Sequence, residues 1–123
     1  MKRIVMLCLC AMMLCSCGTE NDEMKEVSSQ VINCTQKEEL MNEGAVLIDV
    51  RSASEYAEGH LDKSINLTVD TIGVNIETLV SDKNTKIIVY CRSGNRSATA
   101  ANTLISLGYK NVYDLGAMSN CSK

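Results

Sequence analysis

The sequence KIIVYCRSGNRS, residues 86–97, contains the strongest structural signal in the chain. The apolar, β-branched run from Lys86 to Tyr90 is typical of a strand that is buried on both faces of a parallel sheet. Residues 91–96 are polar and include a glycine, so they predict a loop. From Ser97 to Leu107 the apolar residues fall on one side of a helical pattern, which predicts a helix. Strand, loop and helix in this order are the repeating unit of α/β sheets.

The rest of the domain repeats this alternation of strand and helix. Apolar runs predict further strands at residues 31–33, 46–50, 64–67 and 112–115. Thr35 with Glu38, and Ser52 with Glu55, have the spacing of capping boxes and predict the starts of two helices. Residues 75–80 predict a third helix. Alternating strands and helices favour right-handed crossovers. The predicted fold class is therefore α/β, a single domain with about five parallel strands and helices on both faces of the sheet.

The N-terminus has the layout of a secretion signal. Lys2 and Arg3 form a basic start, and the apolar stretch from Ile4 to Leu14 is too short to span a bilayer comfortably. It ends in Leu14-Cys15-Ser16-Cys17, which resembles the lipobox of bacterial lipoproteins, in which the cysteine receives a diacylglycerol group. An ordinary signal peptide with a spare thiol is the alternative. We expect lipidation of Cys17.

This interpretation divides the chain into three parts. Residues 1–16 are the signal peptide, residues 17–30 are the lipidated cysteine with a polar, acidic tether, and residues 31–123 are the domain. We expect the lipid to hold the domain at the cell membrane, on its extracytoplasmic face. Loss of Lys2 and Arg3 leaves 10 basic and 15 acidic residues, a net charge of −5. An acidic domain without a basic patch argues against nucleic acid as a partner.

The cysteines of the predicted domain are Cys34, Cys91 and Cys121. Their number is odd, their spacings show no pairing, and His60 is the only histidine in the chain. We therefore expect neither a disulfide framework nor a zinc site.

Cys91 has the features of a reactive thiol. A short loop between a strand and a helix turns successive backbone N–H groups inward, and the helix N-terminus adds its positive dipole end. Arg92 and Arg96 add positive charge, and Gly94 permits backbone angles that other residues resist. All of these favour an exposed thiolate over a thiol. Cysteine at a strand end is more often a packing residue, but a packing cysteine needs no polar, doubly basic surroundings.

Three motifs in the chain resemble the rhodanese-like family. They are Ile48-Asp49-Val50-Arg51 with Glu55-Tyr56, Gly59-His60-Leu61 and Ser64 to Leu67; Val89 to Ser97 around Cys91; and Leu107-Gly108-Tyr109 with Val112 to Gly116. Together they cover about residues 31 to 118. The tryptophan that often follows the last glycine-rich turn in that family is absent here, so we expect weak covering at the C-terminus.

The resemblance implies a sulfurtransferase without a metal or organic cofactor. Cys91 would take the outer sulfur of thiosulfate or a persulfide and pass it to cyanide or a thiol, so small sulfur anions and thiol acceptors are the expected partners. The substrate-binding residues would be the rest of the loop, which comprises Arg92, Ser93, Gly94, Asn95, Arg96 and Ser97. Arg96 has the alternative of pairing with a carboxylate of the scaffold. Asp49, Arg51, Glu55 and His60 would be structural, the first two as an ion pair.

Two other functions compete with sulfur transfer. Related phosphatases place five residues between the cysteine and the arginine, whereas four lie between Cys91 and Arg96, and Ser97 stands where the arginine would be needed. This count disfavours a phosphatase or an arsenate-reducing enzyme. The second competitor is a non-enzymatic redox or sulfur-binding module at the cell envelope, in which Cys91 pairs with Cys34 or Cys121.

Overall fold

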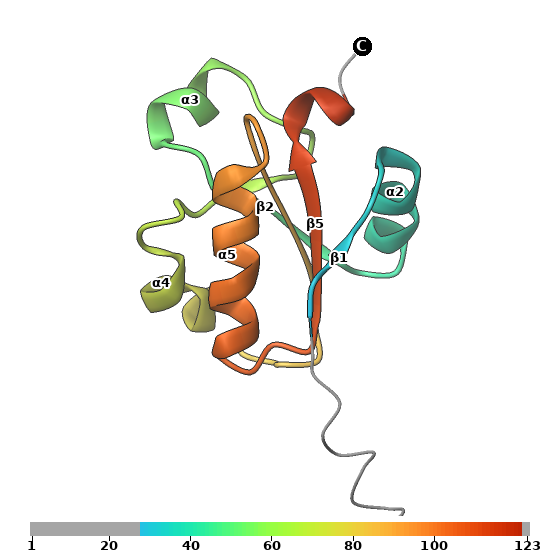
Figure 1. Cartoon of the computed structure of the whole chain (residues 1–123), viewed down its shortest axis with the longest axis vertical. Helices are drawn as coiled ribbons and strands as arrows, with labels where there is room; N and C mark the ends of the chain where they lie inside the picture. The colour runs from blue at the N-terminus through green and yellow to red at the C-terminus, as the bar shows by residue number, and fades with distance from the viewer. Residues whose placement is uncertain (1–27, 122–123) are drawn as a thin grey trace, which may run out of the picture.

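The computed structural model describes residues 28–121, and all five of their strands run parallel in one sheet of order β1-β5-β4-β2-β3 (Figure 1). The predicted α/β class and strand number are confirmed. The elements in chain order are β1 (Gln30–Val31), α2 (Cys34–Asn42), β2 (Val46–Asp49), α3 (Ala53–Glu58), β3 (Ile65–Asn66), α4 (Ile72–Leu79), β4 (Lys86–Cys91), α5 (Asn95–Ser106), β5 (Asn111–Ala117) and the short 3-10 helix η1 (Met118–Asn120).

Helices cover both faces of the sheet, as the alternation predicted. In Figure 1, α4 and α5 lie on one side of the sheet and α2 lies on the other. Alternate residues of β4 point to opposite faces. Ile87, Val89 and Cys91 join the core under α4 and α5, while Ile88 and Tyr90 join the core on the α2 side. All five side chains are fully buried, so β4 is the central strand that its sequence indicated.

Three helix starts differ from the predictions. The capping box of α2 is made by Asn33 and Gln36, at 2.8 and 2.9 Å, two residues before the predicted one. α4 begins at Ile72 instead of residue 75, because Ile72 itself is fully buried in the core. α5 begins at Asn95 instead of Ser97, so the Cys91 loop is shorter than predicted. The box of Ser52 and Glu55 at α3 is confirmed.

A disulfide joins Cys34 to Cys121, with their Cα atoms 5.2 Å apart. The prediction that the domain lacks a disulfide was wrong. The two cysteines are 87 residues apart in sequence, so the tertiary fold and not local spacing brings them together. Cys91 is the free cysteine of the described residues, so it does not have the partner that the redox alternative required.

The predicted signal peptide and Cys17 lie outside the described residues. Between residues 28 and 121, no helix has both the length and the apolar character needed to cross a bilayer.

Candidate active site

Cys91 is the last residue of β4, and its side chain is enclosed by the loop that follows. The backbone N–H groups of Gly94 and Ser97 donate hydrogen bonds to Cys91 Sγ, with N–S distances of 3.0 and 3.3 Å. Ser97 also closes the loop from the other side, since its Oγ donates to the Gly94 carbonyl at 3.0 Å. Two amides aimed at one sulfur favour a negative charge on that atom.

The loop can take this form because of Gly94. Its φ is +105°, in the left-handed region that residues with a Cβ resist. A Cβ at this position would lie no closer than 4.0 Å to its nearest neighbour, the Cα of Gly116, so space does not require the glycine. The backbone angle is therefore the reason for a glycine at this point.

The sulfur is less accessible than the sequence suggested. Cys91 has no exposed surface and belongs to the core cluster under α5, so the expectation of an exposed thiolate was wrong. The short loop folds back over the sulfur, and α5 begins two residues early and tightens it. Attack on a donor therefore needs a local opening of the loop.

Three further amides of the loop remain free to hold an anion. Within residues 28–121, the backbone N–H groups of Ser93, Asn95 and Arg96 donate to no acceptor. They precede or open α5, where the helix dipole favours negative charge. The side chains of Ser93 and Asn95 are exposed. The loop thus has donors on its outer side in addition to those that hold the sulfur.

The two arginines of the loop face the same carboxylate. Arg96 donates from Nη1 and Nη2 to Glu55 of α3, at 2.8 and 3.1 Å, and Arg92 Nε lies 3.4 Å from the same group. The hydrogen bond from Arg96 is the main reason why the pKa of Glu55 lies far below its usual range. The sequence left two roles open for Arg96, substrate binding and pairing with a carboxylate of the scaffold. In the structure Arg96 pairs with the scaffold carboxylate of Glu55. The sequence did not indicate Glu55 as the partner.

Asp49 and Arg51 form a buried ion pair behind the loop. Arg51 Nη2 lies 2.7 Å from Asp49 Oδ2 and also donates to the Gly59 carbonyl at 2.7 Å. The hydrogen bond to Asp49 raises the pKa of Arg51. The Tyr90 hydroxyl donates to the same carboxylate at 2.8 Å, and burial raises the pKa of Tyr90. This network ties β2 to the residue that precedes Cys91.

His60 makes contacts within α3 and the turn after it. Its Nδ1 hydrogen-bonds to the Tyr56 carbonyl at 2.8 Å, and its ring stacks on the Tyr56 ring with centroids 3.7 Å apart. These contacts hold the turn that brings Gly59 to Arg51, which fits the structural role predicted for His60.

A shallow depression of about 250 Å³ lies beside the loop, lined by Arg51, Arg92, Met118 and Ser119. Cys91 itself is not in its lining. The sequence pattern did not indicate Met118 or Ser119, because they follow the last predicted strand and carry no motif. The depression combines two guanidinium groups with a thioether and a hydroxyl, which suits a small anion.

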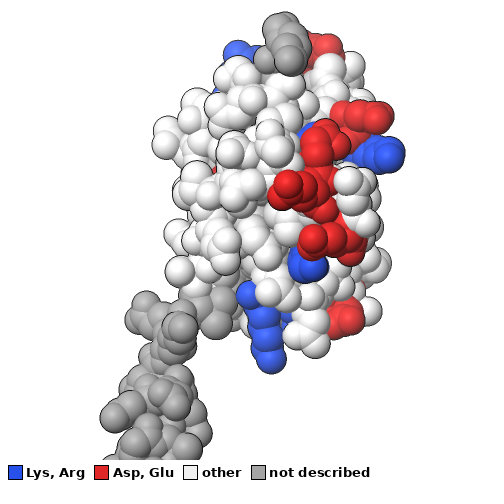
Figure 2. Space-filling model, turned by 90° about the vertical axis from the view of Figure 1, so that its right-hand side faces the viewer, with Lys and Arg blue, Asp and Glu red and all other residues white. Residues whose placement is uncertain are grey.

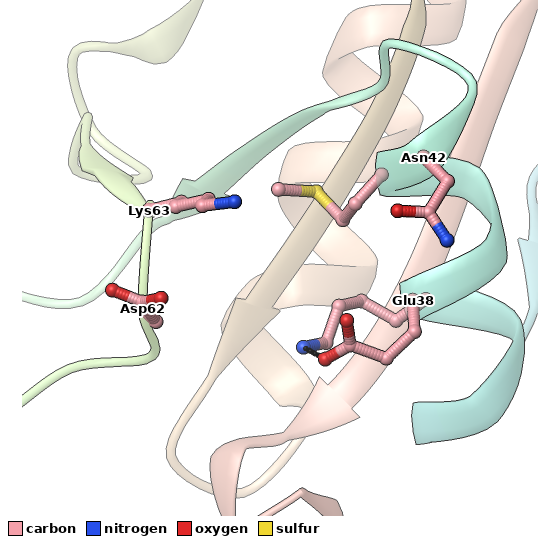
Figure 3. A pocket seen from close by; sticks show the side chains of 6 residues that line it. Glu38, Asn42, Asp62 and Lys63 are labelled. Atoms are coloured by element: carbon pink, nitrogen blue, oxygen red, sulfur yellow. Dashed lines mark hydrogen bonds and ion pairs between the residues drawn. The ribbon is translucent and has the colours of Figure 1, made fainter.

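A second pocket lies between α2 and the loop before β3 (Figure 3). Its charged residues are mixed in sign, with Lys37 and Lys63 beside Glu38 and Asp62 in the lining. Lys37 Nζ pairs with Glu38 at 2.5 Å. Figure 2, which views the side of the molecule that α2 covers, shows acidic side chains gathered there. This pocket is formed by elements other than the Cys91 loop, so it is not part of the candidate active site.

Known proteins resemble this chain both in sequence and in fold. The model of the family described as Rhodanese-like domain matches residues 34–120. The thiosulfate sulfurtransferase PspE of Escherichia coli is 34% identical over 73 residues, which are 59% of this chain and 70% of that protein. A solved rhodanese with anions from E. coli has a TM-score of 0.62 at 32% identity, over 64% of this chain and 93% of that chain.

Other relatives share the domain within different proteins. The tRNA uridine(34) hydroxylase of Buchnera aphidicola is 38% identical over 80 residues, which are 62% of this chain but 26% of that protein. The human single-domain sulfurtransferase TSTD1 has a TM-score of 0.61 at 23% identity, over 71% of this chain and 88% of that chain, a likeness of fold alone.

Proposed function

Because the chain belongs to the rhodanese-like domain family, we propose that it transfers sulfane sulfur through a persulfide on Cys91. The proposed donors are thiosulfate and persulfides, and the proposed acceptors are cyanide and thiols. The observation that carries the proposal is the pair of amide hydrogen bonds, from Gly94 and Ser97, that meet at Cys91 Sγ.

In the first half of the reaction, the Cys91 thiolate attacks the outer sulfur of thiosulfate. A new S–S bond forms at Cys91, the S–S bond of thiosulfate breaks, and sulfite leaves with the electron pair of that bond. The free amides of Ser93, Asn95 and Arg96 are suitably placed to bind the anionic sulfonate end. The buried position of Cys91 favours a donor as small as thiosulfate.

In the second half, the acceptor attacks the outer sulfur of the persulfide. Cyanide gives thiocyanate and a thiolate gives a new persulfide, and in both cases Cys91 leaves as a thiolate. The same two amides that hold the resting sulfur stabilise this leaving group. No step requires a metal or an organic cofactor.

Formation of thiocyanate from thiosulfate and cyanide tests this function. We expect turnover by the purified protein and a loss of at least about a thousand-fold in Cys91→Ala, since the nucleophile is removed. Ser81→Ala is the matched control, because it removes only an exposed hydroxyl and lies outside the Cys91 loop, before the amino end of β4. Absence of thiocyanate with the wild type, or undiminished turnover in Cys91→Ala, would rule out the proposal.

We also propose that the protein is a lipoprotein held at the extracytoplasmic face of the cell membrane through Cys17. The supporting sequence is the basic start, the short apolar stretch and the Leu14-Cys15-Ser16-Cys17 motif. Labelled palmitate fed to cells that express the protein should enter the wild type but not Cys17→Ser, and the variant should leave the membrane fraction. Equal labelling of both proteins would contradict the anchor.

A further inference from the structure

One wall of the depression beside the Cys91 loop comes from the C-terminal segment. Met118 and Ser119 of η1 line it together with Arg51 and Arg92. The segment is short, since η1 contains three residues and Cys121 follows it directly. Whatever holds Met118 and Ser119 in place therefore shapes the approach to the loop.

The same segment adjoins the nucleophile through the sheet. In the register of β4 and β5, Cys91 lies opposite Ala117, the residue immediately before Met118. The loop also faces the end of β5, because the Cβ position of Gly94 is 4.0 Å from the Gly116 Cα. A displacement of the chain after Ala117 therefore acts beside the loop that encloses the sulfur.

Few bonds besides the disulfide hold the segment. Asn120 Nδ2 donates to the carbonyl of Leu115, in the strand just before the segment, at 2.9 Å. Cys121 N donates to the Met118 carbonyl, within the segment, at 3.0 Å. Met118 and Cys121 pack against the core on the α2 side. The disulfide alone joins the segment covalently to a distant element, α2, whose first turn is fixed by the Asn33 capping box.

We propose that the Cys34–Cys121 disulfide positions the wall formed by Met118 and Ser119 and so controls access to Cys91. With the disulfide intact, the wall is fixed and the sulfur stays covered. Reduction by a thiol takes two electrons and two protons from the reductant, gives two cysteine thiols, and leaves the reductant as its own disulfide. The wall then loosens and the loop over Cys91 opens more often.

This inference rests on the proposed function, in which Cys91 carries the sulfur. Thiols are proposed acceptors of that sulfur and are also the reagents that reduce disulfides. A thiol-rich medium would therefore change the site as well as supply its acceptor. Cys34 and Cys121 are positioning residues in this scheme, since they act through Met118 and Ser119 and touch no reacting atom.

The first test follows Cys91 without any turnover. The protein, oxidised or reduced with a phosphine and then freed of it, is treated with iodoacetamide and digested with trypsin. Cleavage after Lys86 and Arg92 releases Cys91 in peptide 87–92, separate from every other cysteine. We expect its alkylation rate to rise about five-fold or more on reduction, because local opening sets the rate of a covered thiol.

The second test uses the thiosulfate–cyanide reaction. The double variant Cys34→Ser/Cys121→Ser should raise kcat/KM for thiosulfate about three-fold or more, because attack on the donor needs the loop over Cys91 to open. Met118→Ala should raise kcat/KM in the same way, and reduction should add little to that rise. Far-UV circular dichroism checks that each variant is folded, and reduced wild type supplies the same comparison without a mutation.

Tyr109→Phe is the control for general loss of stability. It removes a buried hydrogen bond to the Val80 carbonyl at the amino end of the strands, opposite the Cys91 loop. We expect Tyr109→Phe to leave the alkylation rate of Cys91 and kcat/KM for thiosulfate unchanged. The inference is overturned by an unchanged alkylation rate on reduction, by an unchanged kcat/KM in the double variant, or by an equal rise of either quantity in Tyr109→Phe. If the wild type forms no thiocyanate, the proposed function is rejected instead. The alkylation test still shows whether the disulfide controls access to Cys91.

Discussion

Glu55 and Arg96, which are 41 residues apart in sequence, form a two-point ion pair that joins α3 to the first turn of α5. Glu55 is itself fixed at the start of α3, where the backbone N–H of Ser52 donates to its Oε1 at 3.0 Å. Because Arg96 immediately precedes Ser97, whose amide binds Cys91 Sγ, the pair holds the loop in the form that surrounds the sulfur.

Glu55→Gln should therefore weaken sulfur transfer without touching the substrate. The variant loses the charge that Arg96 pairs with but keeps a side chain of the same size. We expect kcat/KM for thiosulfate to fall about three- to ten-fold, as positioning effects of this kind do. Glu58→Gln, on the same helix and exposed, is the matched control and should have wild-type kinetics. Equal kinetics of Glu55→Gln and wild type would show that the pair does not shape the loop.

The same pair predicts a pH dependence of stability. Arg96 holds the pKa of Glu55 far below its ordinary value of 4.5. The stabilisation is thus fully present above pH 4.5 and is lost as the pH falls toward the lowered pKa of the folded state. Urea titrations at pH 6 and pH 3 measure the free energy of unfolding. The difference in this free energy between wild type and Glu55→Gln should be smaller at pH 3 than at pH 6. A difference in the free energy of unfolding that grows at pH 3 would mean that the ion pair of Glu55 and Arg96 does not stabilise the folded state.

Gly94→Ala should damage the site through the backbone. The φ of +105° is unfavourable for alanine by about 1–2 kcal/mol, although the added methyl meets no close neighbour. We expect relaxation of the loop to weaken the bond from the residue 94 amide to the sulfur and to lower kcat/KM about ten-fold or more. Gly44→Ala, at φ +99° after α2, should lose similar stability and keep its activity. Full activity of Gly94→Ala would show that the amide is not needed.

The Cys34–Cys121 disulfide should contribute substantially to stability. It closes a loop of 87 residues, and disulfides of that span typically add about 2–4 kcal/mol to the free energy of unfolding. Reduced wild type and Cys34→Ser/Cys121→Ser should show the same loss in urea. Mass spectrometry of a tryptic digest without reductant checks the pairing itself, since peptide 26–37 should be linked to peptide 111–123. Separate peptides in the unreduced digest would contradict the pairing.

Local signals in the sequence were enough to predict much of the fold. The apolar run before Cys91 identified the central strand, and the box of Ser52 and Glu55 located α3, because both features depend only on neighbouring residues. The start of α2 was misplaced since two capping boxes, at Asn33 and at Thr35, compete within two residues and only the former forms.

Most of the features of the site that sequence reasoning missed join distant parts of the chain. The disulfide spans 87 residues and the pair of Glu55 and Arg96 spans 41. Met118 was overlooked for the same reason, as its role depends on where β5 ends beside β4. The burial of Cys91 depends on how tightly the loop closes, which a pattern of residue types does not report. Spacing predicts local structure, whereas these contacts are set by tertiary packing.

The mass of the Cys91 peptide after exposure to thiosulfate tests most directly whether Cys91 accepts a sulfur atom. The purified protein is incubated with thiosulfate, freed of excess reagent and digested without reductant, and the peptide of residues 87–92 is weighed. We predict a gain of one sulfur atom on this peptide, which disappears when cyanide is added. A peptide of unchanged mass, or a sulfur found on another cysteine while Cys91 stays unmodified, would contradict the account.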